Sequence, residues 1–456
     1  MMVFKPNNIK ICIVSIILTL ISDVSSMEDA GFCDLSGETC TTPANSDRYI
    51  FYDINPPEGF NLRRDVYMRY AIWLHKLQMN RNDLNLKNFK LVLPPWSHLY
   101  HWKYSEVPEH IPWALYFDIE SLKKFAPVIE MHQFFSDYGV TYKKVEIDDV
   151  YILQHYQDMF ETGKFKKVEI DDVYILQHYQ DMFETGKFEE KMSIEDCNIP
   201  IRVNYFYYNN LTSNNVRCLS FHGHTSQLTS ILKNSTASSF LFDHAEVALH
   251  DMFGDKLYWK CRRSMRFNRE LHKIAKKFRE EQLDADDKKD MTILPDDWRK
   301  EIPRRNAIGG PYLGIHLRRA DFVRSRSKEI PTIENAVKQI KNKLYELKLN
   351  KVFIATDAPS NEIIEIQSRL EPEYTIITYK PEDWVGEKYK DGGIAIIEQI
   401  ICSYARYFIG TYESTYSFRI QEEREILGFP VESTFNRLCY DGSESCSKPS
   451  IWKIVY

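Results

Sequence analysis

The sequence lacks a strong excess of charge of either sign. Its 456 residues include 59 lysines and arginines and 65 aspartates and glutamates, a formal net charge of −6. Such a mild imbalance offers no broad basic surface for nucleic acid or an anionic membrane, and we expect neither partner. Hydrophobic residues make up 43% of the chain and aromatic residues 14%, which excludes a disordered protein, and the length allows two or three domains.

Long hydrophobic runs are also lacking. An apolar run covers Ile11–Ile21, which is too short to span a bilayer, and no later run is long enough to do so. Lys5 and Lys10 precede this run and small residues follow it at 24–26, an order typical of a secretory signal peptide. We therefore expect residues 1–26 to be removed, and the mature protein to reside in the secretory pathway, or to be secreted, without a membrane span.

No cysteine has the spacing of a metal site. Eight of the nine cysteines follow the expected signal peptide, and an oxidising compartment favours disulfides among them. Spacing suggests three pairs: Cys33–Cys40, Cys197–Cys218 and Cys439–Cys446. Cys261 and Cys402 remain, and Cys402 lies in an apolar helix where we expect a buried thiol. Sequons at Asn210 and Asn234 fit the same compartment and predict exposed loops there.

Two other motifs lack the context that a metal site requires. Asp284-Ala285-Asp286 resembles the D-x-D of metal-dependent sugar transferases, which follows a strand, but here it lies in a charged, helix-favouring region at 266–301. His222-Gly223-His224 ends a strand expected at 216–221 and has no third ligand in register. We therefore predict no metal site.

The stretch Gly310–Phe322, GPYLGIHLRRADF, is the strongest candidate for a binding site. Its apolar run predicts a buried strand that brings His316, Arg318 and Arg319 to its carboxyl end. Ligands bind at that end of an open parallel sheet, and two guanidinium groups there suit a diphosphate. The alternative is that the arginines form surface salt bridges.

A second stretch also points to an anion. A strand predicted at Arg48–Ile54 is followed by a helix that begins near Asn61 and carries Arg63 and Arg64 in its first turn. Cations at a helix N-terminus oppose the macrodipole, so a bound anion there would make the arrangement favourable. Alternatively, Asp65 and solvent screen them. In the intervening loop Glu58 is the sole carboxylate, and Gly59 lets a ligand approach the backbone.

The last third of the chain alternates between strands and helices. Strands are predicted at 311–316, 351–356, 374–378 and 406–410, and helices at 333–347, at 361–370, from Asp391 and from Thr415. This alternation predicts a parallel sheet with right-handed crossovers, as in a Rossmann-like domain.

Three polar residues in this region look functional. Thr415 and Tyr416 open a helix, where hydroxyl and free N–H groups suit phosphate. Glu398 lies in a nearly all-apolar helix, and a buried carboxylate needs hydrogen-bond donors. The edge of a guanine would supply two donors, and Arg406 is the alternative structural partner.

Two features of the first half have no assigned role. The aromatic-rich stretch Trp96–Trp102 follows a strand predicted at Phe89–Leu93 and fits either core or binding surface. Residues 143–165 recur without a single change as 166–188. Solenoid repeats diverge and need three or more copies, so we interpret this pair as a recent exon duplication or an error in the gene model. If both copies are translated, we expect one to be extruded as a poorly packed insertion.

Several motifs together resemble the protein O-fucosyltransferases, and among them the branch that modifies thrombospondin type 1 repeats. They are PPEGFNLRRDVY, LVLPPW-x-x-LYHW, GGPYLGIHLRR-x-DF, KVF-x-ATDA, YKDGG-x-AII-x-Q-x-IC and SFRI-x-EEREILG. The resemblance runs from Tyr49 to Tyr456, interrupted by one copy of the duplication. Their order and density make the assignment specific.

The resemblance implies an α/β, GT-B-like fold with two facing Rossmann-like domains and a nucleotide-sugar cleft between them. We expect a signal peptide at 1–26, a loop at 27–47, an N-terminal domain at 48–255 and a C-terminal GDP-fucose-binding domain at 256–456. The family implies an inverting transferase without metal or other cofactor, which uses GDP-fucose on folded thrombospondin type 1 repeats in the endoplasmic reticulum lumen. We expect a monomer.

The resemblance also assigns the site residues. Glu58 would be the catalytic base. The contacts to the nucleotide sugar would come from Pro57, Glu58, Gly59, Phe60, Asn61, His316, Leu317, Arg318, Glu398, Thr415 and Tyr416. Glu398 stands where the family has an aspartate, and Tyr416 where we expect a phenylalanine.

Two rival functions remain at this stage. The related transferase of epidermal-growth-factor-like repeats shares the fold and the HLR motif, although PPEGFNLRRD and LPPW-x-x-LYHW favour the thrombospondin-repeat enzyme. A catalytically dead lumenal protein that binds folded repeats is the other. Intact Glu58 and Arg318 argue against it, unless the duplication displaces the acceptor groove.

Overall fold

The structure is a computed structural model, and its description covers only part of the chain. The described residues are 47–56, 58–80, 86, 88–97, 99, 102, 110–137, 145–155, 190–197, 201–412, 414–443, 446 and 453–456. The expected signal peptide, the Cys33–Cys40 pair, Pro57 and the second repeat copy lie outside them. In the part that is described, no helix is both long and apolar enough to cross a membrane.

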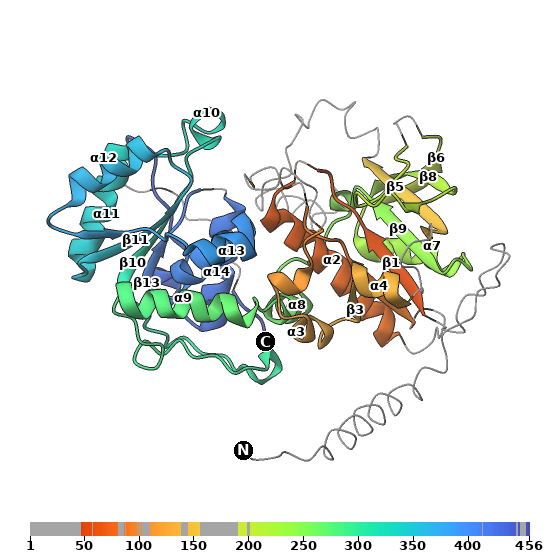
Figure 1. Ribbon diagram of the computed structural model, residues 1–456, viewed down its shortest axis with the longest axis horizontal. Helices are drawn as coiled ribbons and strands as arrows, with labels where there is room; N and C mark the ends of the chain where they lie inside the picture. Colours follow the sequence, from red (N-terminus) through yellow and green to blue (C-terminus); the bar gives the residue numbers. More distant parts are fainter. Residues whose placement is uncertain are drawn as a thin grey trace, which may run out of the picture.

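Two sheets form the framework (Figure 1). The first has the order β3–β2–β1–β9–β5–β8–β6 and the second β12–β11–β10–β13, while β4 and β7 pair separately. The strands are β1 Arg48–Tyr52, β2 Phe89–Leu93, β3 Val128–Glu130, β4 Val145–Glu146, β5 Asp149–His155, β6 Lys191–Glu195, β7 Leu211–Thr212, β8 Val216–His222, β9 Ser239–Asp243, β10 Gly310–Leu317, β11 Lys351–Thr356, β12 Thr375–Ile377 and β13 Ala405–Ile409.

Helices cover both sheets. The α-helices are α2 Phe60–Met79, α3 Ile119–Lys123, α4 Met131–Asp137, α7 Thr229–Lys233, α8 Lys256–Ser264, α9 Arg269–Gln282, α10 Phe322–Ser325, α11 Ile333–Leu347, α12 Ser360–Leu370, α13 Asp383–Ser403 and α14 Thr415–Leu427. Short 3-10 turns are η2 Trp113–Leu115, η3 Thr225–Leu228, η4 Ala245–Val247, η5 Trp298–Lys300 and η6 Val431–Ser433.

The first sheet is parallel except for its edge strand β6, which pairs antiparallel with β8. The five residues of β9 are all buried, as expected for a strand covered on both faces. Helix α2 is buried around most of its circumference because it packs on the sheet and also against α8 and α14.

The first repeat copy supplies two strands of this framework. Its residues 145–155 form β4 and β5, and β5 lies between β9 and β8, pairing in parallel with each. The second copy, 166–188, lies outside the described residues. The repeat therefore includes sheet structure that the first half of the fold requires.

The second sheet agrees closely with the sequence prediction. β10 lies between β11 and β13 and is parallel to both, and the strand–helix alternation is present throughout. The helix predicted from Asp391 is the second segment of α13, which as a whole begins at Asp383. The backbone of Lys390 leaves the helical region with φ 51°, so two helical segments meet in a kink just before Asp391-Gly392-Gly393.

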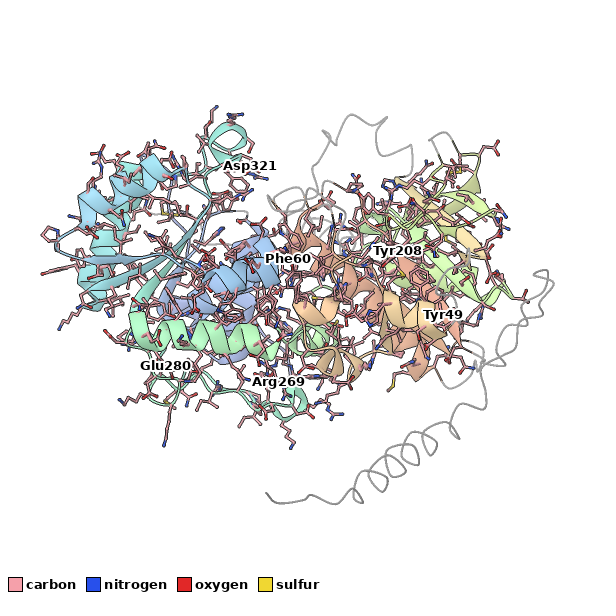
Figure 2. All side chains as sticks on the ribbon, in the orientation of Figure 1. Tyr49, Phe60, Tyr208, Arg269, Glu280 and Asp321 are labelled. Atoms are coloured by element: carbon pink, nitrogen blue, oxygen red, sulfur yellow. A yellow bond between two sulfur atoms is a disulfide. The ribbon has the colours of Figure 1, made fainter. Side chains whose placement is uncertain are left out.

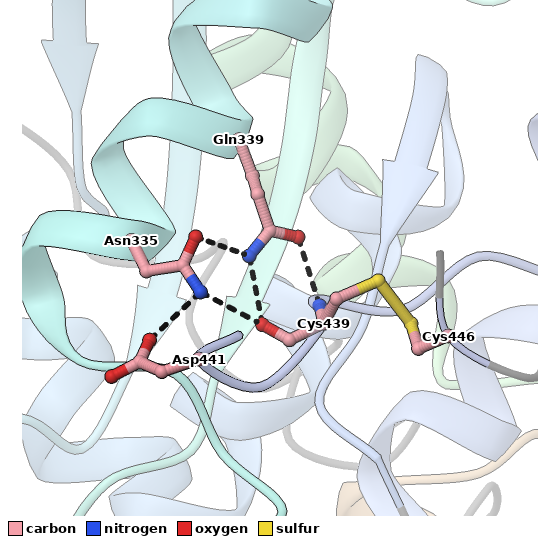
Figure 3. Close-up of a disulfide and its surroundings, with 5 residues drawn as sticks. All are labelled: Asn335, Gln339, Cys439, Asp441 and Cys446. Atoms are coloured by element: carbon pink, nitrogen blue, oxygen red, sulfur yellow. Dashed lines mark hydrogen bonds between the residues drawn. A yellow bond between two sulfur atoms is a disulfide. The ribbon is translucent and has the colours of Figure 1, made fainter. Parts of the chain in front are cut away.

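Both disulfides that fall within the described residues are confirmed as Cys197–Cys218 and Cys439–Cys446. Hydrogen bonds hold the segment of the second disulfide on α11: Gln339 Nε2 donates to the Cys439 carbonyl (2.8 Å), and Asn335 Nδ2 donates to Asp441 (2.7 Å) (Figure 3). Cys261 and Cys402 are buried thiols, as expected for Cys402.

The sequon asparagines differ in exposure. Asn234 is exposed, as its sequon predicted. Asn210 is half-buried, and its backbone carbonyl accepts from the amide of Val145.

A buried network of charges joins α2 of the first half to α14 of the second. Asp65 on α2 accepts from Arg69 (2.8 Å), from Arg419 on α14 (2.9 Å) and from His250 (3.1 Å). Arg419 also pairs with Glu422, at 2.8 Å. Burial alone would raise the pKa of Asp65, but His250, Arg69 and Arg419 hold it well below its usual value.

Candidate active site

A cavity of about 230 Å³ lies where the carboxyl end of β10 faces the start of α2. Its lining comprises Gly59, Phe60, Asn61, Leu62, Leu99 and Trp102 from the first half of the chain, and His316, Arg318, Asp321, Phe322, Ala355, Thr356, Asp357, Asp391, Ala395, Glu398, Ser414, Thr415 and Tyr416 from the second. Phe60 lies between the two sheets in Figure 2. The site is therefore shared by both halves of the fold, at the strand ends where an open parallel sheet binds ligands.

Most of the residues predicted for the site line this cavity, and of the described ones only Glu58 and Leu317 do not. Pro57 lies outside the described residues. Glu58 is half-buried and immediately precedes the lining residue Gly59. The side chain of Leu317 packs in the core of the second sheet, and its carbonyl accepts from Thr356 (2.6 Å).

The two adjacent arginines have different roles. Arg318 lines the cavity, where its guanidinium pairs with Asp357 (2.6 Å) and Asp321 (2.7 Å). Arg319 turns away, pairing with Glu362 (2.8 Å) and donating to the Pro331 carbonyl (2.9 Å). The expectation of two guanidinium groups facing a diphosphate was therefore wrong for Arg319, whose guanidinium is fixed by a carboxylate on α12.

His316 is held as a neutral imidazole on the cavity wall. Its Nδ1 lies 2.7 Å from Ser417 Oγ, and its ring stacks on Tyr416 with centroids 4.4 Å apart. Burial and the nearby Arg318 lower its pKa to about 3, so the imidazole is uncharged at physiological pH. Thr411 fixes the same turn, since its hydroxyl donates to the His316 carbonyl (2.8 Å).

The start of α14 contributes backbone donors to the cavity wall. Ser414 precedes the helix without a side-chain cap, and the first turn contains no acidic residue. Thr415 and Tyr416 line the cavity, and the Tyr416 hydroxyl donates to the Ala395 carbonyl (2.9 Å). An uncapped helix N-terminus with a local positive potential can hold an anion at this position.

Glu398 faces the cavity rather than a protein cation. Arg406, the alternative structural partner, donates instead to the Gly309 carbonyl (3.0 Å). Burial raises the pKa of Glu398 to about 8, so the free protein carries a largely protonated carboxyl at neutral pH. A ligand that presents donors here can ionise it.

The loop that contains Glu58 is held through its backbone. The Glu58 amide donates to the Asn55 carbonyl (3.0 Å), and Arg63 Nε donates to the Glu58 carbonyl (3.0 Å). Arg63 Nη2 also reaches the Pro56 carbonyl at 3.4 Å. Arg63 thus binds the carbonyl groups of its own loop, and the bound anion that the sequence suggested stays a prediction.

Arg64 also departs from the sequence prediction. Its guanidinium is buried beside the rings of Phe60, Phe117 and Phe267, and Nη1 donates to Asn61 Oδ1 (3.2 Å) and to Gln399 Oε1 (3.1 Å). Asp65 does not screen it, because that carboxylate pairs with Arg69, Arg419 and His250.

The aromatic stretch after β2 contributes to both core and site. Trp96 and Leu99 are buried, and Trp102 is half-buried and lines the cavity. Phe60 packs on Trp96 with ring centroids 4.7 Å apart and on Trp102 at 6.0 Å. The sequence left the stretch that contains Leu99 and Trp102 open between core and binding surface, and it assigned no role to Asp321 or Asp357. Only Asp357, directly after a predicted strand, carried a signal.

The motifs rejected as metal sites have other partners. Asp284 pairs with Lys351 (2.7 Å), and Asp286 accepts from the backbone amide of Lys288 (3.0 Å). His224 pairs with Glu190 at 2.7 Å. Within the described ranges, no three His, Cys, Asp or Glu side chains gather as metal ligands.

A larger and more open depression, of about 780 Å³, lies beside β5 and β8. Its carboxylates are already engaged, because Asp149 accepts from Ser235 (3.0 Å) and Asp148 accepts from the hydroxyl of Ser239 (2.9 Å). These bonds fix the segment before β9, so we assign the depression no catalytic role.

Comparison with known proteins agrees with this geometry. The family model for GDP-fucose protein O-fucosyltransferase matches residues 49–427. The chain is 43% identical to GDP-fucose protein O-fucosyltransferase 2 of Caenorhabditis elegans over 424 residues, covering 90% of each chain. It is 41% identical to the Homo sapiens protein of that name over 416 residues, covering 91% of each, which confirms the resemblance seen in the motifs.

A solved structure supports the fold. The crystal structure of POFUT1 in complex with GDP has a TM-score of 0.50 to this chain at 15% identity, covering 88% of this chain and 100% of that one. The α/β, GT-B-like architecture expected from the sequence is confirmed. Since the family match covers most of the described fold and the cavity, the chain belongs to the GDP-fucose protein O-fucosyltransferase family and is a glycosyltransferase.

Proposed function

We propose that this enzyme transfers fucose from GDP-fucose, with inversion at the anomeric carbon, to Ser or Thr hydroxyls of folded thrombospondin type 1 repeats. The observation that carries the proposal is the cavity in which Gly59, Phe60 and Asn61 face Arg318 and Glu398. One side thus has a carboxylate-bearing loop, and the other has donors for a nucleotide diphosphate.

The donor nucleotide would lie against the second sheet. Arg318 and the first-turn amides of α14 suit the diphosphate, because a guanidinium fork and an uncapped helix start both present N–H groups to phosphate oxygens. Glu398 suits the guanine edge, whose adjacent N–H groups would donate to its carboxylate. In this arrangement the fucose would point toward the loop of Glu58.

Glu58 is the base in this proposal. As the acceptor hydroxyl oxygen attacks the anomeric carbon, the bond from that carbon to the diphosphate breaks, and the hydroxyl proton passes to the Glu58 carboxylate. GDP then leaves with the electron pair of the broken bond. The loop is preformed for this role, because Arg63 and Asn55 hold the backbone of Glu58 on both sides.

The developing charge on the diphosphate would be met by the protein itself. Arg318 and the α14 N-terminus supply positive potential at the cavity wall, so we propose that no metal or other cofactor is required. Asp321 and Asp357 hold the Arg318 guanidinium in place until a phosphate competes for it.

The proposed acceptor and compartment are supported mainly by features of the sequence. The curated relatives share the name GDP-fucose protein O-fucosyltransferase 2, and PPEGFNLRRD and LPPW-x-x-LYHW resemble the branch that modifies thrombospondin type 1 repeats. The apolar run Ile11–Ile21 and the Cys197–Cys218 and Cys439–Cys446 disulfides support the endoplasmic reticulum lumen.

Mass spectrometry of three acceptors tests this function. The purified protein is incubated with GDP-fucose and EDTA, together with a folded thrombospondin type 1 repeat, the same repeat reduced and alkylated, or a folded epidermal-growth-factor-like repeat. We expect one deoxyhexose on a Ser or Thr of the folded thrombospondin repeat alone.

The other outcomes separate the alternatives. Addition to the epidermal-growth-factor-like repeat would assign the related activity, and loss of transfer with EDTA would overturn metal independence. If the protein binds the repeat but neither transfers fucose nor hydrolyses GDP-fucose, it is the non-catalytic binder.

A further inference from the structure

Three side chains from opposite halves of the fold form a closed set of hydrogen bonds beside the cavity. Arg64 Nη1 donates to Asn61 Oδ1 at 3.2 Å and to Gln399 Oε1 at 3.1 Å. Gln399 Nε2 in turn donates to Asn61 Oδ1 at 3.1 Å. Asn61 and Arg64 lie on α2, whereas Gln399 lies on α13, and all three side chains are buried.

The chemistry of Arg64 fixes the orientation of both amides. A guanidinium only donates, so the atoms that face it must be the oxygens of Asn61 and Gln399. Asn61 Oδ1 then receives two donors, which occupies both of its lone pairs. Asn61 also lines the cavity, and its Nδ2 has no acceptor among the described residues. The polar group that Asn61 can offer a ligand is thus its N–H donor pair.

Arg64 is enclosed in the protein interior, where its Nη1 makes these two hydrogen bonds. It is only 1% exposed, and three aromatic rings enclose it at 4.9 to 5.7 Å. Its Nε and Nη2 groups are buried with no hydrogen-bond partner in the described part of the chain. Unpaired buried N–H groups are costly, so the two bonds of Nη1 are the favourable polar contacts that the guanidinium makes there.

We propose that Arg64 and Gln399 are positioning residues that hold Asn61 with Nδ2 toward the cavity, where it donates to a diphosphate or sugar oxygen of the donor substrate. The inference rests on the proposed donor, GDP-fucose. Because Gln399 follows the cavity residue Glu398 on α13, the orientation of an amide on the first half depends on a helix of the second. Gln399 must both accept and donate, which neither a carboxylate nor an apolar side chain can do.

A double-mutant cycle on Gln399→Met and Asn61→Ala tests the proposal. Methionine keeps the length of the side chain and removes both hydrogen bonds. We expect Gln399→Met alone to weaken GDP-fucose kcat/KM and the calorimetric affinity for GDP by about tenfold. In the Asn61→Ala background, the same substitution should change either quantity less than twofold, because the residue through which it acts is absent.

Tyr116→Phe is the matched control. It removes another buried hydrogen bond between the halves, from the Tyr116 hydroxyl to the Tyr389 carbonyl (3.2 Å), without touching Asn61. The factor by which Tyr116→Phe alone changes kcat/KM and the GDP affinity should be the same in the Asn61→Ala background. Thermal unfolding verifies that each variant is folded, and if Gln399→Met is not, Arg64→Lys takes its place in the cycle.

The outcomes distinguish this inference from the proposed function. If Gln399→Met lowers kcat/KM and the GDP affinity by the same factor in the wild type and in Asn61→Ala, the positioning role is wrong, since Gln399 would then act independently of Asn61. Wild-type protein that neither binds GDP nor transfers fucose would instead refute the proposed function.

Discussion

The two side chains that directly follow β10, Arg318 and Arg319, have different roles, one in binding and one in structure. Arg318 faces the cavity, whereas its neighbour Arg319 is fixed by Glu362 on α12. We predict that Arg318→Lys lowers kcat on the order of a hundredfold, because an ammonium group cannot reproduce the guanidinium fork toward a diphosphate. Steady-state kinetics with GDP-fucose measure this effect.

Arg319→Lys is the control for that variant. It should lower the unfolding temperature and leave kcat within about threefold, because its partners are Glu362 and the Pro331 carbonyl. A larger loss of kcat for Arg319→Lys than for Arg318→Lys would reverse the assignment of the two arginines.

Glu58 should be essential for transfer but not for binding. Glu58→Gln keeps the size and the backbone contacts of the loop and removes the proton acceptor, so we expect a loss of kcat on the order of a hundredfold or more. Calorimetric GDP affinity should stay within about twofold of the wild type. Near-normal turnover would assign the base elsewhere.

Glu398 should release a proton when the nucleotide binds. Its pKa in the free protein is raised to about 8, so the carboxyl is mostly protonated at pH 7, and guanine donors would ionise it. Binding of GDP measured in buffers of different ionisation enthalpy should therefore show up to about one proton released, and Glu398→Gln should not show this release. Equal proton counts for both proteins would remove Glu398 from the guanine site.

The raised pKa of Glu398 also predicts how the stability of the folded protein depends on pH. Because the folded pKa exceeds the ordinary value of 4.5, the contribution of the neutral carboxyl is fully present below pH 4.5 and is lost as pH rises through about 8. The unfolding temperature of the ligand-free protein should thus fall across this range less steeply in Glu398→Gln than in the wild type.

At the scale of elements, the repeat has a clear experimental consequence. The first copy contributes β5, which pairs on both sides within the first sheet, and the copies are identical. Deleting either copy gives the same shorter chain, which still contains one complete β4–β5 segment. We predict that this single-copy protein keeps the unfolding temperature and GDP affinity of the parent.

Ile152→Asp is the destabilising control, made in both the parent protein and the single-copy protein. Ile152 is buried in β5 at the level of Cys218, and a buried unpaired charge there should prevent folding. Failure of the single-copy protein to fold would show that the first sheet requires residues of both copies.

Elements of the second half were predictable because the strands there are short apolar runs separated by amphipathic helices. β10, β11, β13 and α14 all lie within one or two residues of the sequence prediction. In the first half β5 and β9 were not predicted. β5 lies within the repeat, to which the sequence assigned no structural role, and β9 was missed although it is as long as β13.

The candidate site was predictable only in part. A motif indicates which residue types are available, as with Glu58, His316 and Arg318. Their partners depend on tertiary structure: Arg64 and Gln399 are 335 positions apart, and Arg319 and Glu362 are 43 apart. The different roles of Arg318 and Arg319 therefore could not be read from HLRR.

At the scale of the whole molecule, the buried charges between α2 and α14 should stabilise the arrangement of the two halves. Removing one partner leaves an uncompensated charge in the interior, so we predict that Arg419→Met lowers the free energy of unfolding by about 3–5 kcal/mol. Urea denaturation measures this change.

An exposed ion pair is the control for that effect. Arg299 pairs with Asp297 at 2.7 Å on the surface, and Arg299→Met should produce no measurable change in the urea midpoint. A similarly small effect for Arg419→Met would mean that this charge network contributes little to holding the two halves together.

The repeated segment also makes the folding of this molecule degenerate. Two identical strand sequences compete for one position between β9 and β8, and the choice determines only whether the additional residues enter the chain before or after that strand. Loop-closure entropy varies logarithmically with length, so the two topological isomers differ by less than about 1 kcal/mol. Loop closure alone therefore does not decide which of the two identical copies forms the strand between β9 and β8.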